Sequence, residues 1–64
     1  MYQKYAALRD ERHMTDYQVA KEAGITATAL YEWKSGRSTP KVDKLAKIAK
    51  LFHVPLEQLI GEGE

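Results

Sequence analysis

Apolar residues recur every three or four positions along most of the chain, which is the spacing of amphipathic α-helices. Tyr5 and Leu8 lie three residues apart among charged neighbours and predict a first helix over about residues 2–12. His13 follows directly and is expected to adopt the left-handed conformation that commonly ends a helix. Because no segment alternates apolar and polar residues, the pattern predicts no β-strand.

Two further helices are predicted on either side of a tight turn. Thr15 and Gln18 form the Thr-x-x-Gln pattern of a capping box, so the second helix is expected to begin at Thr15. Gly24 is expected to end this helix because glycine adopts a positive φ at little steric cost. Thr26 then caps a third helix that runs to about Ser35.

The last two helices follow a loop of sequence Gly-Arg-Ser-Thr-Pro. Thr39 and Pro40 are predicted to open the fourth helix, since proline is tolerated in a first turn. The apolar spacing of this helix continues to about residue 52. The segment 53–55 breaks it, and a short fifth helix is expected to end at Gly61.

The length and composition of the chain limit the possible architectures. A chain of 64 residues forms one domain. We expect residues 1–61 to form an all-α domain of five helices, and residues 62–64 to be a flexible tail or a truncated linker. The absence of cysteine excludes disulfides and cysteine zinc sites. No stretch approaches the roughly 20 apolar residues of a membrane span, so a cytoplasmic protein without a membrane partner is expected.

The charge of the chain is distributed unevenly, although its net value is only +1. Residues 34–50 contain six basic side chains and one acidic side chain, whereas the segments on either side are net acidic. A cationic middle segment of this kind is typical of a local phosphate-binding surface. The alternative is a solvated lysine face on one helix.

The residues around Gly24 indicate two helices that cross at a steep angle. Ala20 is small enough to let the next helix approach, and Ile25 is expected to fill the gap at the turn. Leu30 and Trp33 lie three positions apart and are expected to anchor the third helix in the core. This spacing is the main sequence evidence for a helix-turn-helix unit.

The opposite face of the third helix has a different composition. At 100° per residue, four side chains point away from the core, with Ala27 at the edge of the same face: Thr28, Tyr31, Glu32 and Ser35. The small side chains at its start would allow that end of the helix to approach a surface closely. A DNA major groove about 12 Å wide accepts such a helix end. The alternative is that Ala and Thr are ordinary exposed residues.

Taken in order, these residues resemble the Cro/CI-type helix-turn-helix family, the lambda-repressor-like or XRE domains, over about residues 4–60. The matching positions are Leu8-Arg9, Met14-Thr15, Val19-Ala20, Gly24-Ile25-Thr26, Leu30, Trp33, Ser35-Gly36-Arg37, Pro40, Leu45, Ile48-Ala49 and Val54-Pro55-Leu56-Glu57-Gln58-Leu59. The resemblance implies a five-helix, all-α domain whose third helix enters the major groove of double-stranded DNA. It also implies a bacterial, archaeal or phage transcription regulator that binds palindromic sites as a dimer, and it favours a repressor over an activator.

Carried over position by position, the resemblance implies two sets of DNA contacts. Base reading falls on one face of the third helix: Ala27, Thr28 and Glu32, with Tyr31 beside them. The Ala or Thr methyl group matches a thymine methyl, and the glutamate matches the amino group of cytosine. Phosphate contacts fall on the start of the second helix and after the third helix: Thr15, Asp16, Tyr17, Gln18, Ser35, Arg37, Ser38 and Lys41.

Three positions depart from the family pattern. Asp16 stands where the family most often has Gln, and a carboxylate repels phosphate, so either Gln18 or Tyr17 takes over or binding is weak. Lys34 stands where the family usually has a Glu that pairs with an arginine matching Arg9. Arg9 therefore needs another carboxylate or faces solvent. Glu32 is the third departure, because it adds negative charge to the base-reading face of the third helix. These departures lower the expected affinity without disturbing the core.

Other functions are less well supported by the sequence. No arrangement resembles a nucleophile with its base, and there is no glycine-rich phosphate loop, so an enzyme is not expected. His13 and His53 lie at helix ends and are expected to cap or pack, so no metal, cofactor or small-molecule ligand is predicted. The alternative function is a protein-interaction module with weak or no sequence-specific DNA binding, which Asp16 and Glu32 support.

The C-terminal helix offers a candidate surface for a homodimer. Leu56, Leu59 and Ile60 supply apolar side chains that are suited to such a contact. The alternative is that Leu59 and Ile60 close the core of the monomer. Both interpretations remain open at the level of sequence.

Overall fold

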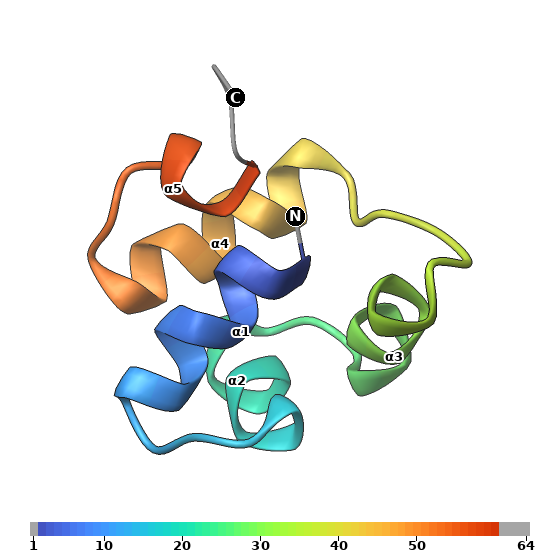
Figure 1. The fold of residues 1–64 in the computed structure, drawn as a ribbon, viewed down its shortest axis with the longest axis horizontal. Coiled ribbons are helices and arrows are strands. Elements are labelled where there is room, and N and C mark those ends of the chain that lie inside the picture. Colours follow the sequence, from blue (N-terminus) through green and yellow to red (C-terminus); the bar gives the residue numbers. More distant parts are fainter. Residues whose placement is uncertain (1, 61–64) are drawn as a thin grey trace.

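The computed structural model describes residues 2–60 and contains five α-helices (Figure 1). They are α1 (Tyr2–Glu11), α2 (Asp16–Ala23), α3 (Ala27–Ser35), α4 (Val42–Phe52) and α5 (Glu57–Ile60). Because this part of the chain contains no strand, the predicted all-α, five-helix fold is confirmed. Gly61 and the tail predicted at 62–64 lie outside the described residues.

Helix α4 supplies the largest share of a core to which all five helices contribute. Its buried side chains follow the spacing of a single helical face. Burial of each large apolar side chain contributes about 1.5–3 kcal/mol. The complete buried set is Tyr5, Val19, Ala20, Leu30, Trp33, Leu45, Ile48, Ala49, Phe52 and Leu59.

Four aromatic rings tie α1 to α3 and α4. The Tyr5 ring stacks on Trp33 at a centroid distance of 5.3 Å, and it stacks on Phe52 at 6.1 Å. Tyr2 meets Trp33 edge to face at 5.6 Å. Because such pairs add about 0.5–1.5 kcal/mol beyond area burial, this cluster holds α3 firmly against α1.

Helix α5 packs against α1 and α4 (Figure 1). Leu59 is fully buried, so this side chain closes the core of the monomer, as one of the two interpretations predicted. Leu56 and Ile60 are half-buried and pack against the same core. Of the three apolar side chains proposed for a dimer contact, only Leu56, just before α5, and Ile60 therefore keep part of their surface exposed.

The helix ends mostly follow the sequence signals. His13 has the predicted left-handed backbone, with φ of 55°, and Gly24 ends α2 with φ of 78°. The predicted start of α4 at Thr39 and Pro40 is wrong, because Lys41 keeps an extended backbone with ψ of 163°. The Lys41 carbonyl accepts the first hydrogen bonds of the helix, which therefore begins at Val42.

Candidate nucleic-acid interface

The turn between α2 and α3 is built from local hydrogen bonds. The backbone N–H groups of Gly24 and Ile25 both donate to the Ala20 carbonyl at 3.0 Å. The Ile25 side chain is half-buried against the core, as predicted for a residue that fills the turn. Thr26 Oγ1 then accepts from the backbone N–H of Ala29 at 3.2 Å and caps α3. Because α2 packs directly on α3, this turn fixes the two helices as one unit.

Helix α3 has a buried side and an exposed side. Leu30 is fully buried and Trp33 is 4% exposed, so both anchor the helix in the core as predicted. On the other side Thr28 is exposed, and Tyr31 is 56% exposed. Ala27 is half-buried at the edge, close to the core. The orientation predicted from 100° per residue is the orientation found.

Glu32 has contacts that the sequence did not reveal. Its carboxylate accepts a hydrogen bond from Ser38 Oγ at 3.3 Å, and its side chain is half-buried. Its carbonyl accepts from the Ser35 hydroxyl at 3.1 Å and from the backbone N–H of Arg37 at 2.9 Å. Glu32 therefore holds the loop that follows α3, besides facing outward with Tyr31.

The loop between α3 and α4 carries cations at the edge of the molecule (yellow in Figure 1). Arg37 and Lys41 are exposed, and within residues 2–60 neither forms an ion pair with a carboxylate. Ser38 is exposed beside them. A guanidinium and an ammonium that form no ion pair within the described residues are suited to phosphate oxygens.

The start of α2 combines a complete capping box with an exposed ring. Thr15 Oγ1 accepts from the Gln18 backbone N–H at 3.1 Å, and Gln18 Oε1 accepts from the Thr15 backbone N–H at 2.9 Å. The predicted capping box is therefore confirmed. Tyr17 follows the cap and is 64% exposed. The first intrahelical bond runs from Val19 to Thr15, so the amides of Asp16 and Tyr17 precede the hydrogen-bonded ladder.

Asp16 differs from its neighbours because its carboxylate points to α1. It accepts hydrogen bonds from Tyr5 Oη at 2.6 Å, from Arg9 Nη1 at 2.7 Å and from Tyr2 Oη at 3.0 Å. Its side chain is only 10% exposed. The carboxylate that the sequence put among the phosphate contacts is thus engaged inside the protein, and its charge is paired with a guanidinium.

This network shifts the pKa values of its members. Burial raises the pKa of the Asp16 carboxyl, but the hydrogen bonds from Tyr5, Arg9 and Tyr2 outweigh burial and bring that pKa below its usual value. Burial raises the pKa of Tyr5 and Tyr2, and their hydrogen bonds to Asp16 add to the effect. At neutral pH the carboxylate is therefore ionised while both hydroxyls keep their protons.

The carboxylate that pairs with Arg9, which the sequence did not identify, belongs to Asp16. Besides Asp16, Arg9 pairs with Asp10 through Nη2 at 2.9 Å, and the hydrogen bond to Asp16 raises its pKa. Lys34 is exposed. One signal in the sequence indicates this arrangement: Tyr2, Tyr5 and Arg9 follow i, i+3, i+7 spacing, so all three lie on one helical face.

Most of the predicted site residues are exposed, and the exceptions are half-buried. They belong to three consecutive segments: the start of α2, the outer side of α3, and the loop after it. Those exposed are Thr15, Tyr17, Gln18, Thr28, Tyr31, Ser35, Arg37, Ser38 and Lys41, and those half-buried are Asp16, Ala27 and Glu32.

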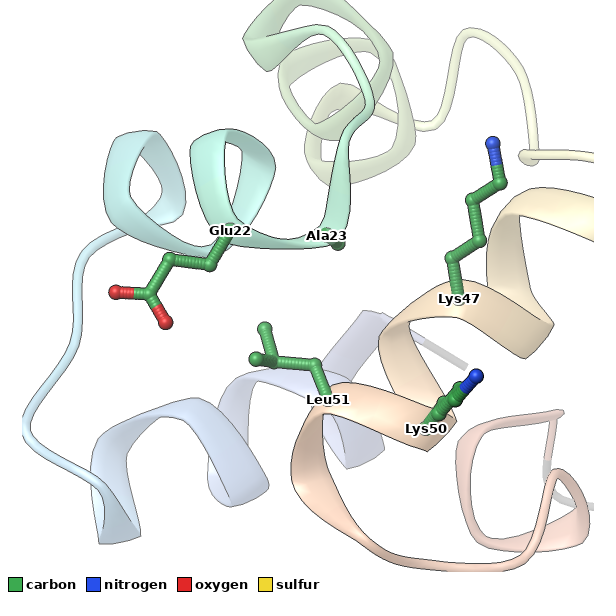
Figure 2. Close-up of a pocket in the computed structure, with 5 residues that line it drawn as sticks. All are labelled: Glu22, Ala23, Lys47, Lys50 and Leu51. Atoms are coloured by element: carbon green, nitrogen blue, oxygen red, sulfur yellow. The ribbon is translucent and has the colours of Figure 1, made fainter.

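Other kinds of site find little support in the described part of the chain. Among residues 2–60, no group of His, Cys, Asp or Glu side chains is arranged to hold a metal ion. A shallow hollow of about 200 Å³ lies between Glu22 and Ala23 of α2 and Lys47, Lys50 and Leu51 of α4 (Figure 2). Its volume is below the roughly 300–1,000 Å³ of typical ligand pockets. Every helix in this part of the chain is too short or too polar to cross a membrane.

Comparison with known proteins shows the family to which the chain belongs. A family model described as helix-turn-helix matches residues 6–59. The chain therefore belongs to the helix-turn-helix family, and the resemblance to its Cro/CI-type members is confirmed. The match includes the start of α2, all of α3 and the loop after it.

Two relatives are similar to nearly the whole chain. The HTH-type transcriptional activator BcrR of Enterococcus faecalis is 31% identical over 97% of this chain and 30% of its own length. The cryptic phage CTXphi transcriptional repressor RstR of Vibrio cholerae is 30% identical over 95% of this chain and 55% of its own length. The chain thus spans about half or less of these relatives. No solved structure matches at a comparable level of significance.

Proposed function

We propose that this helix-turn-helix domain binds double-stranded DNA in a sequence-specific manner, with α3 in the major groove, as part of a transcription regulator. The observation that carries the proposal is the division of α3. Leu30 and Trp33 are buried, so Thr28 and Tyr31 are presented outward on a rigid helix. Binding of this kind is non-enzymatic and needs neither a cofactor nor a metal ion.

Base reading is proposed for the outer side of α3. The methyl groups of Ala27 and Thr28 are suited to a thymine methyl, and the Tyr31 ring lies beside them on the same face. Glu32 is suited to the amino group of cytosine. Since a carboxylate has about four acceptor positions, its hydrogen bond from Ser38 leaves capacity for a base.

Phosphate contacts are proposed for the segments on either side of α3. Arg37 and Lys41 supply the cations. Ser35 and Ser38 would donate to a phosphate by exchanging the hydrogen bonds that their hydroxyls give to Glu32. At the start of α2, the Tyr17 amide and the side chains of Thr15, Tyr17 and Gln18 supply donors, because the Thr15 and Gln18 amides are used in the capping box. The Asp16 carboxylate has no such role, because Arg9 and two tyrosines hold it, so its backbone N–H alone remains for a phosphate.

The regulatory role rests on the relatives. One of them is named an activator and the other a repressor. We propose repression, because a domain seated in the major groove blocks access to its site without any further contact. The protein would act in the cytoplasm, where prokaryotic DNA lies.

We propose that the DNA-bound state is a homodimer on a palindromic site. A single α3 reads few base pairs, and two copies would double the sequence that is recognised. The half-buried side chains of Ile60 in α5 and of Leu56, which directly precedes this helix, are candidates for the contact. The half-sites would then lie one DNA turn apart, roughly 34 Å.

Selection of bound duplexes from a random DNA pool tests the proposal most directly. We expect one preferred sequence with two related half-sites. Fluorescence polarisation on the selected duplex over a salt series should show affinity falling steeply as salt rises, since each neutralised phosphate contributes about −0.9 to the logarithmic slope. No measurable binding at low salt would instead favour a protein-interaction module, for which the exposed rings of Tyr17 and Tyr31 are suited.

A further inference from the structure

The hydrogen-bond network between α1 and the first residue of α2 is more extensive than a helix cap requires. Asp16 receives three donors from α1, namely Tyr2, Tyr5 and Arg9. Arg9 Nη1 also donates to Tyr2 Oη at 3.0 Å, which closes the network. Since these partners lie 7 to 14 positions before Asp16, the network joins two helices.

The network leaves the charge at the start of α2 compensated. The Asp16 side chain is 10% exposed and the Arg9 side chain 18% exposed, so both groups are largely removed from water. Hydrogen bonds between ionised groups are shorter and stronger than neutral ones, and the 2.7 Å distance from Arg9 fits that class. An unpaired carboxylate in this position would oppose a phosphate, whereas a paired and inward-pointing one does not.

The capping box leaves two amides available at the same helix end. The Gln18 N–H is taken by Thr15 Oγ1, whereas the N–H groups of Asp16 and Tyr17 precede the first intrahelical bond. Because the Asp16 carboxylate is bound to α1, the direction in which these amides point is fixed relative to α1. The aromatic cluster of Tyr5 and Trp33 fixes α1 relative to α3 in turn.

We propose that Asp16 is a positioning residue for DNA binding. Held by Arg9, Tyr2 and Tyr5, it orients the first turn of α2 so that the free amides meet a DNA phosphate while α3 occupies the groove. This inference rests on the proposed function, and it reverses the effect expected from the sequence, where a carboxylate at Asp16 weakens binding. The two interpretations predict opposite changes in DNA affinity when the Asp16 carboxylate is removed: weaker binding if the residue positions α2, and stronger binding if it repels phosphate.

The test is the affinity of Asp16→Asn for the selected duplex, measured by fluorescence polarisation with the full 64-residue chain. The variant should bind about two- to fivefold more weakly, the typical range for loss of one contact between a helix terminus and an anion. The folded fraction of each variant is measured by circular dichroism at the titration temperature, and affinities are expressed per folded molecule. Equal or tighter binding by Asp16→Asn would overturn the proposal.

Arg12 provides a matched control for general loosening of the fold. It lies on α1 as Arg9 does, but it donates to the Phe52 carbonyl at 2.7 Å and to the Leu8 carbonyl at 3.0 Å, so it braces α4. Arg12→Gln should lower stability and leave the affinity of the folded protein unchanged. If Arg12→Gln weakens binding as much as Asp16→Asn does, the loss is not specific to the start of α2 and the proposal fails.

Amide signals give a readout that a purely structural role would not change. In nuclear magnetic resonance spectra, DNA should shift the backbone N–H signals of Asp16 and Tyr17 in the parent protein, and the shifts should shrink in Asp16→Asn. Unshifted signals in the parent protein would contradict the proposal.

If the parent protein itself binds no DNA at low salt, the proposed function fails. If it binds and Asp16→Asn binds equally well, only the positioning role fails.

Discussion

The two sides of the helix-turn-helix unit are constrained to very different degrees. On the inner side, Leu30 and Trp33 are enclosed by residues of other helices, and Tyr5 stacks on the indole. On the outer side, Thr28 and Tyr31 are exposed on the same helix. Because a helix is rigid, strict packing inside determines orientation outside. Substitutions on the two sides should therefore affect different quantities, stability on the inner side and binding on the outer side.

The first turn of helix α2 also has one side chain that is held within the protein and a neighbour that is exposed. Asp16 is bound inward to three side chains of α1, whereas its neighbour Tyr17 is 64% exposed. Polar residues therefore occur on both sides of the interface, and polarity by itself does not identify the binding surface. Engagement within the fold, rather than residue type, separates the structural side from the binding side.

The largest expected effect is that of Trp33→Ala. Removing a buried indole that contacts Tyr2 and Tyr5 should destabilise the domain by about 3–5 kcal/mol. Stable small domains have only about 5–15 kcal/mol in total, so much of the variant should be unfolded at 37 °C. Urea unfolding followed by far-ultraviolet circular dichroism measures the difference.

Tyr31→Ala is the matched control, since it removes another aromatic ring from the same helix. Its side chain is 56% exposed, so stability should change by no more than about 0.5 kcal/mol. Comparable losses from the two substitutions would contradict the division of α3 into a packed and a free side.

Gly24→Val should have the next largest effect, because the turn fixes how α2 and α3 cross. The φ of Gly24 is 78°, and no atom lies within 4 Å of an added Cβ, so the cost is conformational rather than steric. A β-branched residue at positive φ should cost roughly 1–3 kcal/mol. Gly24→Asn, which tolerates this backbone better, should lose clearly less in the same urea experiment. Equal losses would show that the left-handed backbone is not the cause.

Local signals in the sequence predicted most of the fold. The capping box of Thr15 and Gln18, the left-handed Gly24 and the Thr26 cap depend on residues a few positions apart, and each was found. The inward side of α3 followed from helical spacing in the same way. The start of α4 was predicted too early, because a proline signals a nearby helix start without specifying which residue keeps the extended backbone.

Contacts between distant residues were less predictable. The sequence predicted that Arg9 either pairs with another carboxylate or faces solvent. Three carboxylates lie within seven positions of it, Asp10, Glu11 and Asp16, and only the packing of α1 on α2 makes Asp16 the buried partner. The hydrogen bond from Ser38 to Glu32 depends on the path of the loop after α3. The roles assigned to the site residues by family resemblance remain predictions.

Arg37→Ala should weaken DNA binding without lowering the stability of the domain. Arg37 is exposed and has no ion-pair partner among residues 2–60, so its loss should leave stability within about 0.5 kcal/mol. DNA affinity should fall about tenfold, the effect of one hydrogen-bonded charge, and to the same extent on every sequence. The salt slope should decrease by about 0.9 if one phosphate contact is lost. A loss confined to the selected duplex would instead make Arg37 a base-reading residue.

Thr28→Ala should have the smallest effect, and it separates base reading from phosphate binding. Loss of the side-chain methyl should weaken binding about fourfold, the equivalent of one buried methyl group, at a site with thymine opposite α3. Affinity for duplexes with another base at that position should barely change. The preference of the protein for thymine over the other bases should therefore decrease, while its free energy of unfolding stays constant. Competition titrations against a set of single-base variants of the selected duplex measure this. A uniform loss over all duplexes would mean that Thr28 contacts the DNA backbone, and that the exposed side of α3 approaches the groove by a different edge.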